Sequence, residues 1–151
     1  MRISKTAPER TGWRDQGISE HHRLWGVGAL AVDVDFVLLE YSWNGPAALI
    51  EYKNEYAREA DYSNGSYRAL AVLASGGCTP FFESRYKSDF TSYEVTPLNG
   101  IAKRYWLENG PVTMTEKEYV TFLYLLRAQP LPSYLDWDGG SLRDSEGGTN
   151  D

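Results

Sequence analysis

The sequence predicts one domain of the α/β or α+β class, in which helices flank a single mixed central sheet. The chain has 151 residues, of which 42% are hydrophobic and 24% charged. That length and composition suit one hydrophobic core and hardly two. Segments with the pattern of strands alternate along the chain with segments typical of helices. A hairpin that is followed by a helix and a further strand requires a crossover connection, and we therefore expect a mixed sheet.

The first half of the chain predicts a short helix and then a hairpin. Residues 16–25 are expected to form the helix, which ends at Gly26. Residues 29–41 (ALAVDVDFVLLEY) and 47–53 (AALIEYK) are rich in large apolar residues and read as strands. The Asn44-Gly45 step between them is a strong hairpin signal.

The second half predicts a helix, two strands and a final helix. Residues 66–75 are apolar and are followed by Gly76-Gly77, which favours a helix that ends there. Residues 80–86 and 91–98 read as strands. The sequence Thr115-Glu116-Lys117-Glu118 is a capping box, and it predicts a helix that continues to about residue 129. We expect the folded domain to span residues 1–135.

The charge of the chain is concentrated at its end. The net charge is −6, and residues 136–151 contain five acids and one arginine, which accounts for −4 of it. This Gly- and Asp-rich segment is predicted to be a disordered acidic tail. The charge balance argues against a protein that binds nucleic acid through high overall positive charge, but it is compatible with a local basic groove.

Cysteine usage and the apolar segments indicate the compartment. Cys78 is the single cysteine, and we expect no internal disulfide and a cytoplasmic location. No apolar run approaches the length that a bilayer requires, and the first sixteen residues lack the apolar stretch of a signal peptide. We therefore expect no association with a membrane.

Charged residues interrupt both strands of the predicted hairpin. Asp33 and Asp35 lie in the first apolar run, and Glu51 and Lys53 lie at the end of the second. A charge in a buried strand is costly unless it is paired or bound to a metal. Residues two positions apart in a strand share a face, so each pair lies on one face of the sheet.

The turn decides whether both pairs share the same face. A two-residue turn at Asn44-Gly45 would separate them, whereas a three-residue loop pairs Ser42 with Pro46 and places Asp35 opposite Lys53. The three-residue loop requires a left-handed glycine at its third position, where Gly45 stands. Common turn geometry therefore allows the two pairs to meet.

With these residues the chain resembles the PD-(D/E)XK nuclease superfamily, which has the restriction-endonuclease-like fold. The pattern is an acid on one strand, a hairpin, acid-x-Lys on the next strand, and then a helix with further strands. Here it is carried by Asp35, the Asn-Gly turn and Glu51-Tyr52-Lys53. The chain looks particularly similar to the Holliday-junction resolvase branch, and the resemblance covers about residues 16–98. The proline that often precedes the first acid is Val34 here.

The resemblance implies a metal-dependent nuclease that hydrolyses phosphodiester bonds of DNA or RNA. Asp35 and Glu51 would bind Mg²⁺ or Mn²⁺ together with the main-chain carbonyl of Tyr52. Lys53 would orient the attacking water or stabilise the developing charge. The resemblance also implies accessory residues, for which the chain offers Glu20 and Arg68, while Asp33 competes with Asp35 as the first acid.

Two other interpretations stay open. The charged residues can form an internal ion-pair network, with Asp35 bound to Lys53 and Glu51 to Arg68. The chain can also be a catalytically inactive nuclease-fold protein of phage or mobile-element origin that binds a partner protein, as an anti-defence module does. Its 11 tyrosines and 5 tryptophans supply the aromatic side chains that are enriched in binding hot spots. A homodimer is compatible with each interpretation.

Overall fold

The computed structural model describes residues 21, 24–25, 34–106, 110–135, 137–138 and 141–142. The chain divides into two units, residues 1–33 and residues 34–151, and every element named below belongs to the second unit. Of the helix predicted over residues 16–25, only residues 21, 24 and 25 are described, and residues 21 and 24 are helical.

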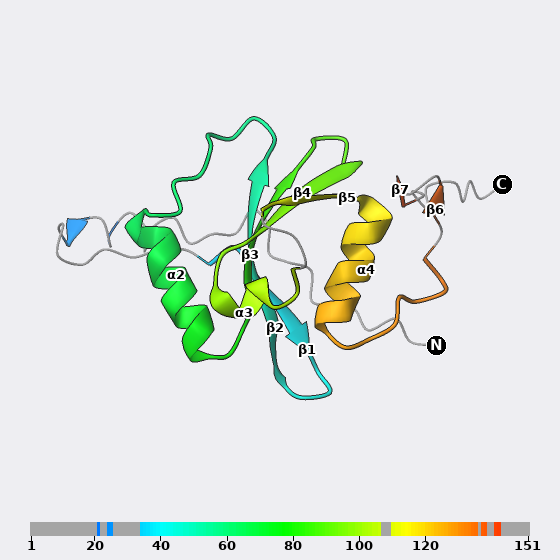
Figure 1. Cartoon of the computed structure of the whole chain (residues 1–151), viewed down its shortest axis with the longest axis horizontal. Coiled ribbons are helices and arrows are strands. Elements are labelled where there is room, and N and C mark those ends of the chain that lie inside the picture. The colour runs from blue at the N-terminus through cyan, green and yellow to red at the C-terminus, as the bar shows by residue number, and fades with distance from the viewer. Residues whose placement is uncertain are drawn as a thin grey trace. The chain divides into compact units, whose positions relative to one another are not determined.

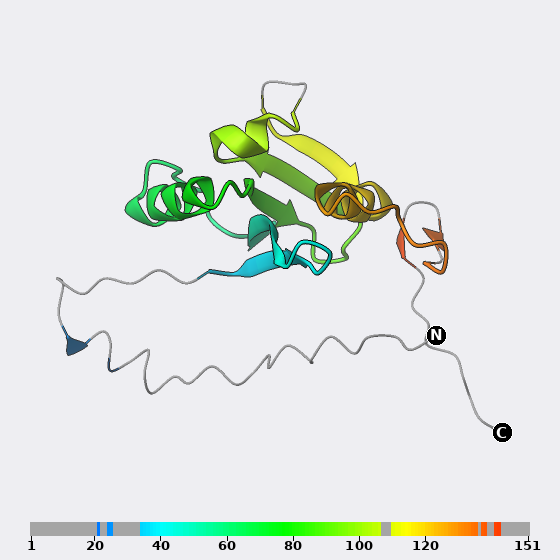
Figure 2. The same ribbon diagram turned by 90° about the horizontal axis from the view of Figure 1, so that it is seen from below.

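A five-stranded mixed sheet forms the centre of this unit, in the order β1-β2-β3-β4-β5. Its strands are β1 (Phe36–Glu40), β2 (Gly45–Asn54), β3 (Phe81–Tyr86), β4 (Ser92–Pro97) and β5 (Val112–Thr115). Strands β2 and β3 are parallel, and all other neighbours are antiparallel. Figure 2 shows β1 and β5 at the two opposite edges of the sheet. The predicted class, a mixed sheet flanked by helices, is confirmed.

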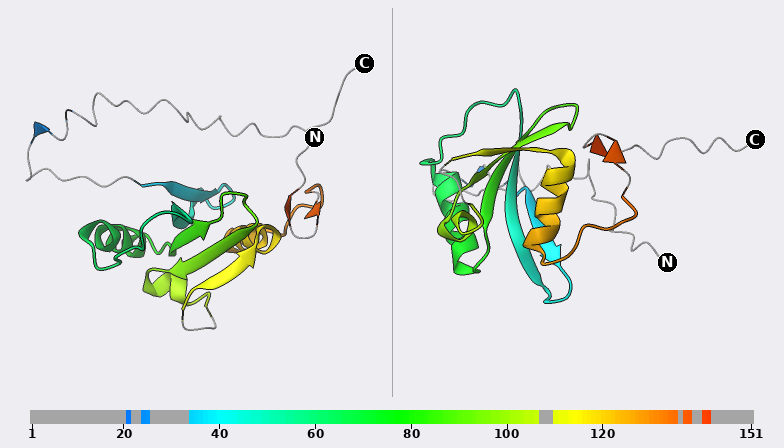
Figure 3. Two further views of the ribbon diagram at one scale, coloured as in Figure 1. Left: turned by 90° about the horizontal axis from the view of Figure 1, so that it is seen from above. Right: turned by 45° about the vertical axis from the view of Figure 1, so that its right-hand side comes forward.

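The two longer helices cover opposite faces of the sheet. Helix α2 (Gly65–Gly76) connects the parallel strands β2 and β3, and α4 (Glu116–Leu126) follows β5. Figures 1 and 3 show the sheet between these two helices. A further short helix, α3 (Gly100–Lys103), follows β4. In the described part of the chain, no helix is long and apolar enough to cross a bilayer.

Each face of the sheet has its own hydrophobic cluster. Between α2 and the sheet lie four buried residues, namely Leu49, Leu70, Ala74 and Phe81. The cluster under α4 is larger and consists of Ala48, Ile50, Phe82, Tyr93, Val95, Ala102, Tyr119, Phe122 and Leu126. Because side chains alternate along a strand, the odd-numbered residues of β2 and β3 face α2 and the even-numbered ones face α4.

The predicted capping box at the start of α4 is confirmed. The Glu118 N–H donates to Oγ1 of Thr115 at 3.3 Å, and the Thr115 N–H donates to Oε2 of Glu118 at 2.8 Å. The helix ends at Leu126 rather than near residue 129, because Ala128 takes a left-handed φ of 52°. The sequence reading did not anticipate α3 or β5, since four-residue elements are too short to show a period.

The hairpin turn is neither the two-residue turn nor the three-residue loop that the sequence allows. Glu40 pairs with Gly45, and the register shifts between Leu38 and Leu39. Asn44, rather than Gly45, is left-handed, with φ 51°. Gly45 is needed for another reason, because a Cβ there would lie 2.9 Å from Cδ1 of Trp43. The register shift has a direct consequence for the charged residues of the hairpin.

Past the shift, Phe36 pairs with Ile50, and the same register places Asp35 across from Glu51. The three-residue loop would have placed Asp35 opposite Lys53, two residues further along β2. A displacement of two residues keeps a side chain on the same face of the sheet. Asp35, Glu51 and Lys53 therefore share a face of the sheet, which is the arrangement that the three-residue loop would also have allowed.

The predicted disordered tail contains two short paired strands. Strand β6 (Trp137–Asp138) pairs with β7 (Ser141–Leu142), and β7 contacts α4. Within the segment predicted to be disordered, these four residues are thus described as a paired hairpin. The other residues of the predicted tail lie outside the described part of the chain.

Candidate active site

The charged residues gather where the parallel strands β2 and β3 end. Glu51 pairs with Glu83, and Lys53 with Arg85, in the register of the two strands. All four have odd numbers and therefore lie on the α2 face of the sheet, after the buried residues Leu49 and Phe81. The carboxyl ends of parallel strands joined by a crossover are the usual place for a ligand site in an α/β sheet.

Asp35 reaches this group from the edge of the sheet. It immediately precedes β1 and is exposed. The pKa of Glu51 is raised, first because the carboxyl is largely buried and further by the charge and hydrogen-bond contact of Asp35. The hydrogen bond from Lys53 acts in the opposite direction. Two carboxylates thus lie together, and the setting disfavours the ionised form of Glu51.

Lys53 supplies the positive charge of the site. Its Nζ lies 2.7 Å from Oε1 of Glu51. The pKa of Lys53 is raised, chiefly by the hydrogen bond to Glu51, while the charges of Asp35 and Glu83 add to the effect. The Lys53 side chain is 33% exposed and that of Glu51 is 14% exposed. The ammonium group is therefore charged at neutral pH and still accessible to a ligand.

Glu83 also belongs to the site, although the sequence did not predict it as a site residue. Its side chain is 4% exposed, and two tyrosine hydroxyls donate to it, Tyr62 to Oε1 at 3.1 Å and Tyr67 to Oε2 at 2.5 Å. Burial and the adjacent Glu83 raise the pKa of Tyr67 far above its ordinary value. One signal was available, because Glu83-Ser84-Arg85 repeats the acid-x-base spacing of residues 51–53.

Arg85 anchors the segment that follows β2. Its Nη1 donates to the carbonyl oxygens of Asn54 at 3.2 Å and Ala57 at 2.8 Å, and its Nη2 donates to that of Arg58 at 3.0 Å. Nη2 also lies 3.9 Å from Oε1 of Glu83. These contacts occupy the guanidinium group with main-chain oxygens, so Arg85 has a structural role beside the site.

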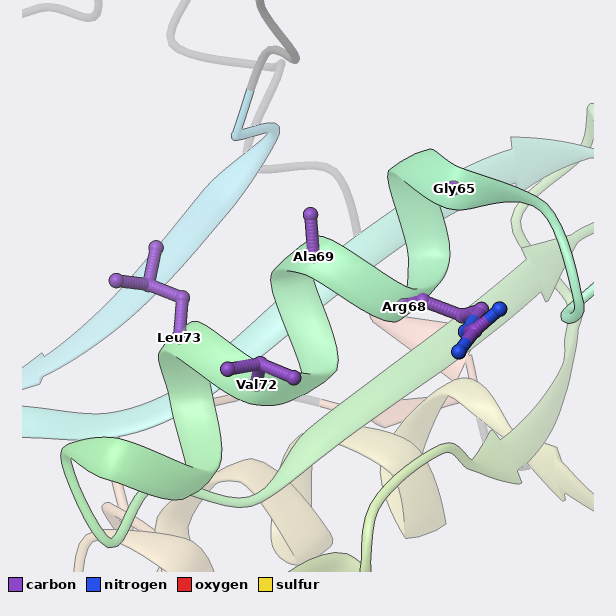
Figure 4. A pocket seen from close by; sticks show the side chains of 5 residues that line it. All are labelled: Gly65, Arg68, Ala69, Val72 and Leu73. Carbon is purple, nitrogen blue, oxygen red and sulfur yellow. The ribbon is translucent and has the colours of Figure 1, made fainter.

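Of the residues predicted to assist the site, the structure describes Arg68 but not Glu20 or Asp33. Arg68 lies on the exposed side of α2 and lines a pocket with Gly65, Ala69, Val72 and Leu73 (Figure 4). The ion pair of Glu51 is with Lys53, so the alternative network with a Glu51–Arg68 pair is not what the structure shows. Glu20 and Asp33 lie outside the described residues.

The site offers oxygen atoms, which are the ligands that hard divalent cations such as Mg²⁺ prefer. Asp35 and Glu51 provide carboxylate oxygens, and a cation would relieve the repulsion that raises the pKa of Glu51. The main-chain N–H groups of Leu49 and Glu55 donate to the carbonyl oxygens of Pro80 and Tyr86 on the β3 side. Because successive residues of a strand direct their main-chain groups to opposite sides, the carbonyl of Tyr52 points away from β3, toward the chain before β1. Within the described residues, no cluster of three or more His, Cys, Asp or Glu side chains could hold a metal. The available set is therefore two carboxylates and a main-chain carbonyl, and Mg²⁺ ordinarily keeps several of its waters.

Comparisons with known proteins give no relative: no family model matches the chain, and no curated protein or solved structure is significantly similar to it. The functional inference therefore depends on the chemistry of the site itself.

Proposed function

We propose that this protein is a metal-dependent nuclease of the PD-(D/E)XK type, which hydrolyses phosphodiester bonds of DNA or RNA with Mg²⁺ or Mn²⁺. The observation that supports this proposal best is the convergence of Asp35, Glu51 and Lys53 on one face of the sheet, with Nζ of Lys53 2.7 Å from Glu51. An acid pair beside a lysine is the arrangement that the motif requires.

In this proposal Asp35, Glu51 and the Tyr52 carbonyl hold the cation. When bound, a divalent cation polarises the scissile phosphate and acidifies a water molecule. Lys53 acts as a cation rather than as a base, since its pKa is raised and the amine stays protonated. Its ammonium can donate to a phosphate oxygen and stabilise the negative charge that develops during attack.

Glu83 acts in this proposal as a support for the site. It lies beside Glu51 on the neighbouring strand and adds to the negative potential that keeps Lys53 protonated. The hydroxyls of Tyr62 and Tyr67 satisfy its carboxylate. Because these hydrogen bonds hold the buried carboxylate of Glu83 in one orientation, it supports the neighbouring Glu51 in a fixed position, as a preorganised site requires.

A cleavage assay tests the proposal. Labelled single-stranded, duplex and branched DNA and single-stranded RNA would be incubated with the full chain in Mg²⁺, Mn²⁺ or EDTA. We expect cleavage that requires the cation and that is lost in Glu51→Gln. Glu94→Gln is a matched control, because Glu94 is exposed on β4 and shares the α2 face. Equal cleavage by wild type and Glu51→Gln, or no cleavage of any substrate, would overturn the proposal.

A second candidate function is protein binding through the edge of the sheet. Strand β1 lies at an edge, and Val37, Leu39, Tyr41 and Trp43 are 47%, 50%, 70% and 47% exposed. Exposed apolar residues on an edge strand favour pairing with another chain. Self-association through this edge predicts a dimer by light scattering that Leu39→Lys converts to a monomer. A monomeric wild type would contradict it.

A further inference from the structure

Tyr56 is the most exposed large hydrophobic side chain of the described residues, at 84%. It lies in the turn directly after β2, and its main-chain N–H donates to Oδ1 of Asn54 at 3.1 Å. No hydrogen bond or ring contact of its side chain is found within the described part of the chain. An aromatic ring in this setting contributes little to the folded state.

The main chain that carries Tyr56 is nevertheless held in place. Arg85 bonds the carbonyl oxygens of residues on both sides of it, at positions 54, 57 and 58. The Ala57 N–H donates to the Asn54 carbonyl at 2.9 Å, and the Glu55 N–H donates to that of Tyr86 at 2.8 Å. A fixed turn presents the ring at little entropic cost to a ligand, which is the advantage of preorganisation.

The turn that carries Tyr56 follows the proposed catalytic residues closely along the chain. Tyr56 is the third residue after Lys53, so their Cα atoms are at most about 11 Å apart. A nucleotide chain with its phosphate at Lys53 therefore has its neighbouring bases within reach of this turn. In proteins that bind single strands, such bases stack on exposed aromatic rings.

The local charge favours an unpaired strand over a duplex. Residues 54–63 contain three exposed acids, Glu55, Glu59 and Asp61, and one exposed base, Arg58. The nearby β3–β4 turn adds one charge of each sign, Lys87 and Asp89. Duplex binding depends more strongly on cations, because both strands carry phosphates, whereas a single strand carries fewer charges and also offers base faces on which an aromatic ring stacks. A duplex keeps those faces covered within its own base stack.

We propose that the turn at residues 54–58 is a stacking platform on which Tyr56 binds an unpaired base next to the cleaved phosphate, so that the substrate is single-stranded or locally unpaired nucleic acid. This inference rests on the proposed nuclease function. It adds a substrate class to that function, and it assigns a binding role to a residue outside the acid-x-Lys motif.

The test measures binding separately from cleavage. In a Lys53→Met background, which leaves both carboxylates in place, anisotropy would report binding of labelled single-stranded DNA, single-stranded RNA and blunt duplex DNA of equal length in Mg²⁺. Tyr56→Ala and Tyr56→Phe would be added to this background. Tyr41→Ala is the matched control, since Tyr41 is 70% exposed at the hairpin turn, at the other end of β2. Cleavage by the corresponding variants with Lys53 intact would be measured in parallel.

We expect Tyr56→Ala to weaken single-strand binding about tenfold, the effect of losing one stacked base. Tyr56→Phe and Tyr41→Ala should leave it unchanged, and duplex affinity should be the same in all variants. A difference between the DNA and RNA arms would identify the preferred sugar. Unchanged single-strand affinity in Tyr56→Ala, or an equal loss for the duplex, would overturn the inference even where wild type cleaves. Tyr56-dependent binding without any cleavage by wild type would instead overturn the nuclease function alone.

Discussion

Glu51 and Glu83 are paired across the parallel strands β2 and β3, and their carboxylates have different partners. Glu83 accepts hydrogen bonds from two tyrosine hydroxyls. Glu51 has one cationic partner, Lys53, and is also in contact with the like-charged Asp35. One acid of the pair is thus satisfied by the fold, while the other is left in a setting that a bound cation would improve. This difference is the basis for assigning Glu83 a structural role and for proposing Glu51 as a metal ligand.

The tyrosine bonds to Glu83 should contribute to stability. Tyr67→Phe removes the donor to Oε2 of a carboxylate that is 4% exposed. A buried acceptor that loses its partner costs about 1–3 kcal/mol, and we expect the free energy of unfolding in urea to fall by that amount. Tyr56→Phe serves as the control, with an effect below about 0.5 kcal/mol. Equal stability of both variants would show that the Tyr67 hydroxyl is not needed.

Glu51 should reduce stability when no metal is present. Its raised pKa means that the folded state disfavours the ionised form relative to the unfolded chain. The cost is present at neutral pH, and it disappears as the pH falls below the pKa of the unfolded state. We therefore expect Glu51→Gln to raise the Tm in EDTA, on the order of 2 °C for a chain of this size. A lower Tm would show that the ion pair with Lys53 outweighs burial and the repulsion from Asp35.

Lys53 should matter for catalysis far more than for folding. Its side chain is 33% exposed, and an ion pair of this kind contributes at most about 1 kcal/mol. Lys53→Met should therefore reduce kcat by about 100-fold or more while the free energy of unfolding changes by less than that. A structural ion-pair network predicts the reverse, with a loss of about 3 kcal/mol, because a buried carboxylate would lose its partner.

The hairpin has a pH-sensitive contact far from the proposed site. The pKa of Glu40 is lowered, first by the Ser42 N–H that donates to its carboxylate and also by Arg127, whose Nε lies 2.9 Å away. The resulting stability is present above the pKa of the unfolded chain and is lost as the pH falls through the lower folded value. Glu40→Gln should flatten the fall in Tm between about pH 5 and pH 3. If Tm falls over this pH range as steeply in Glu40→Gln as in wild type, carboxylates other than Glu40 cause the loss of stability in acid.

The sequence predicted the elements that have long, regular patterns. The hairpin, α2, β3, β4 and the capped start of α4 were found because their apolar spacing and end signals agree. The sequence left the same-face relation of Asp35 and Glu51 open, because a two-residue turn would have placed them on opposite faces. The turn that forms differs in register by two residues from the three-residue loop, and a difference of two keeps Asp35 on the face of Glu51.

Other features depend on contacts that a sequence pattern does not contain. The register shift between Leu38 and Leu39 and the left-handed Asn44 have no signal in the spacing of apolar residues. The role of Glu83 depends on the tyrosines at positions 62 and 67, which reach it only after the crossover through α2 brings β3 beside β2. Short elements such as β5 are defined by a partner strand, because four residues show no period of their own.

The most direct test of the account is a calorimetric titration of Mn²⁺ into wild type and Glu51→Gln, with Glu94→Gln as the control. We predict that wild type and Glu94→Gln bind the cation and that Glu51→Gln does not. Binding that persists unchanged in Glu51→Gln, or no binding to wild type at millimolar concentration, would contradict the assignment of Asp35 and Glu51 as a metal-binding pair.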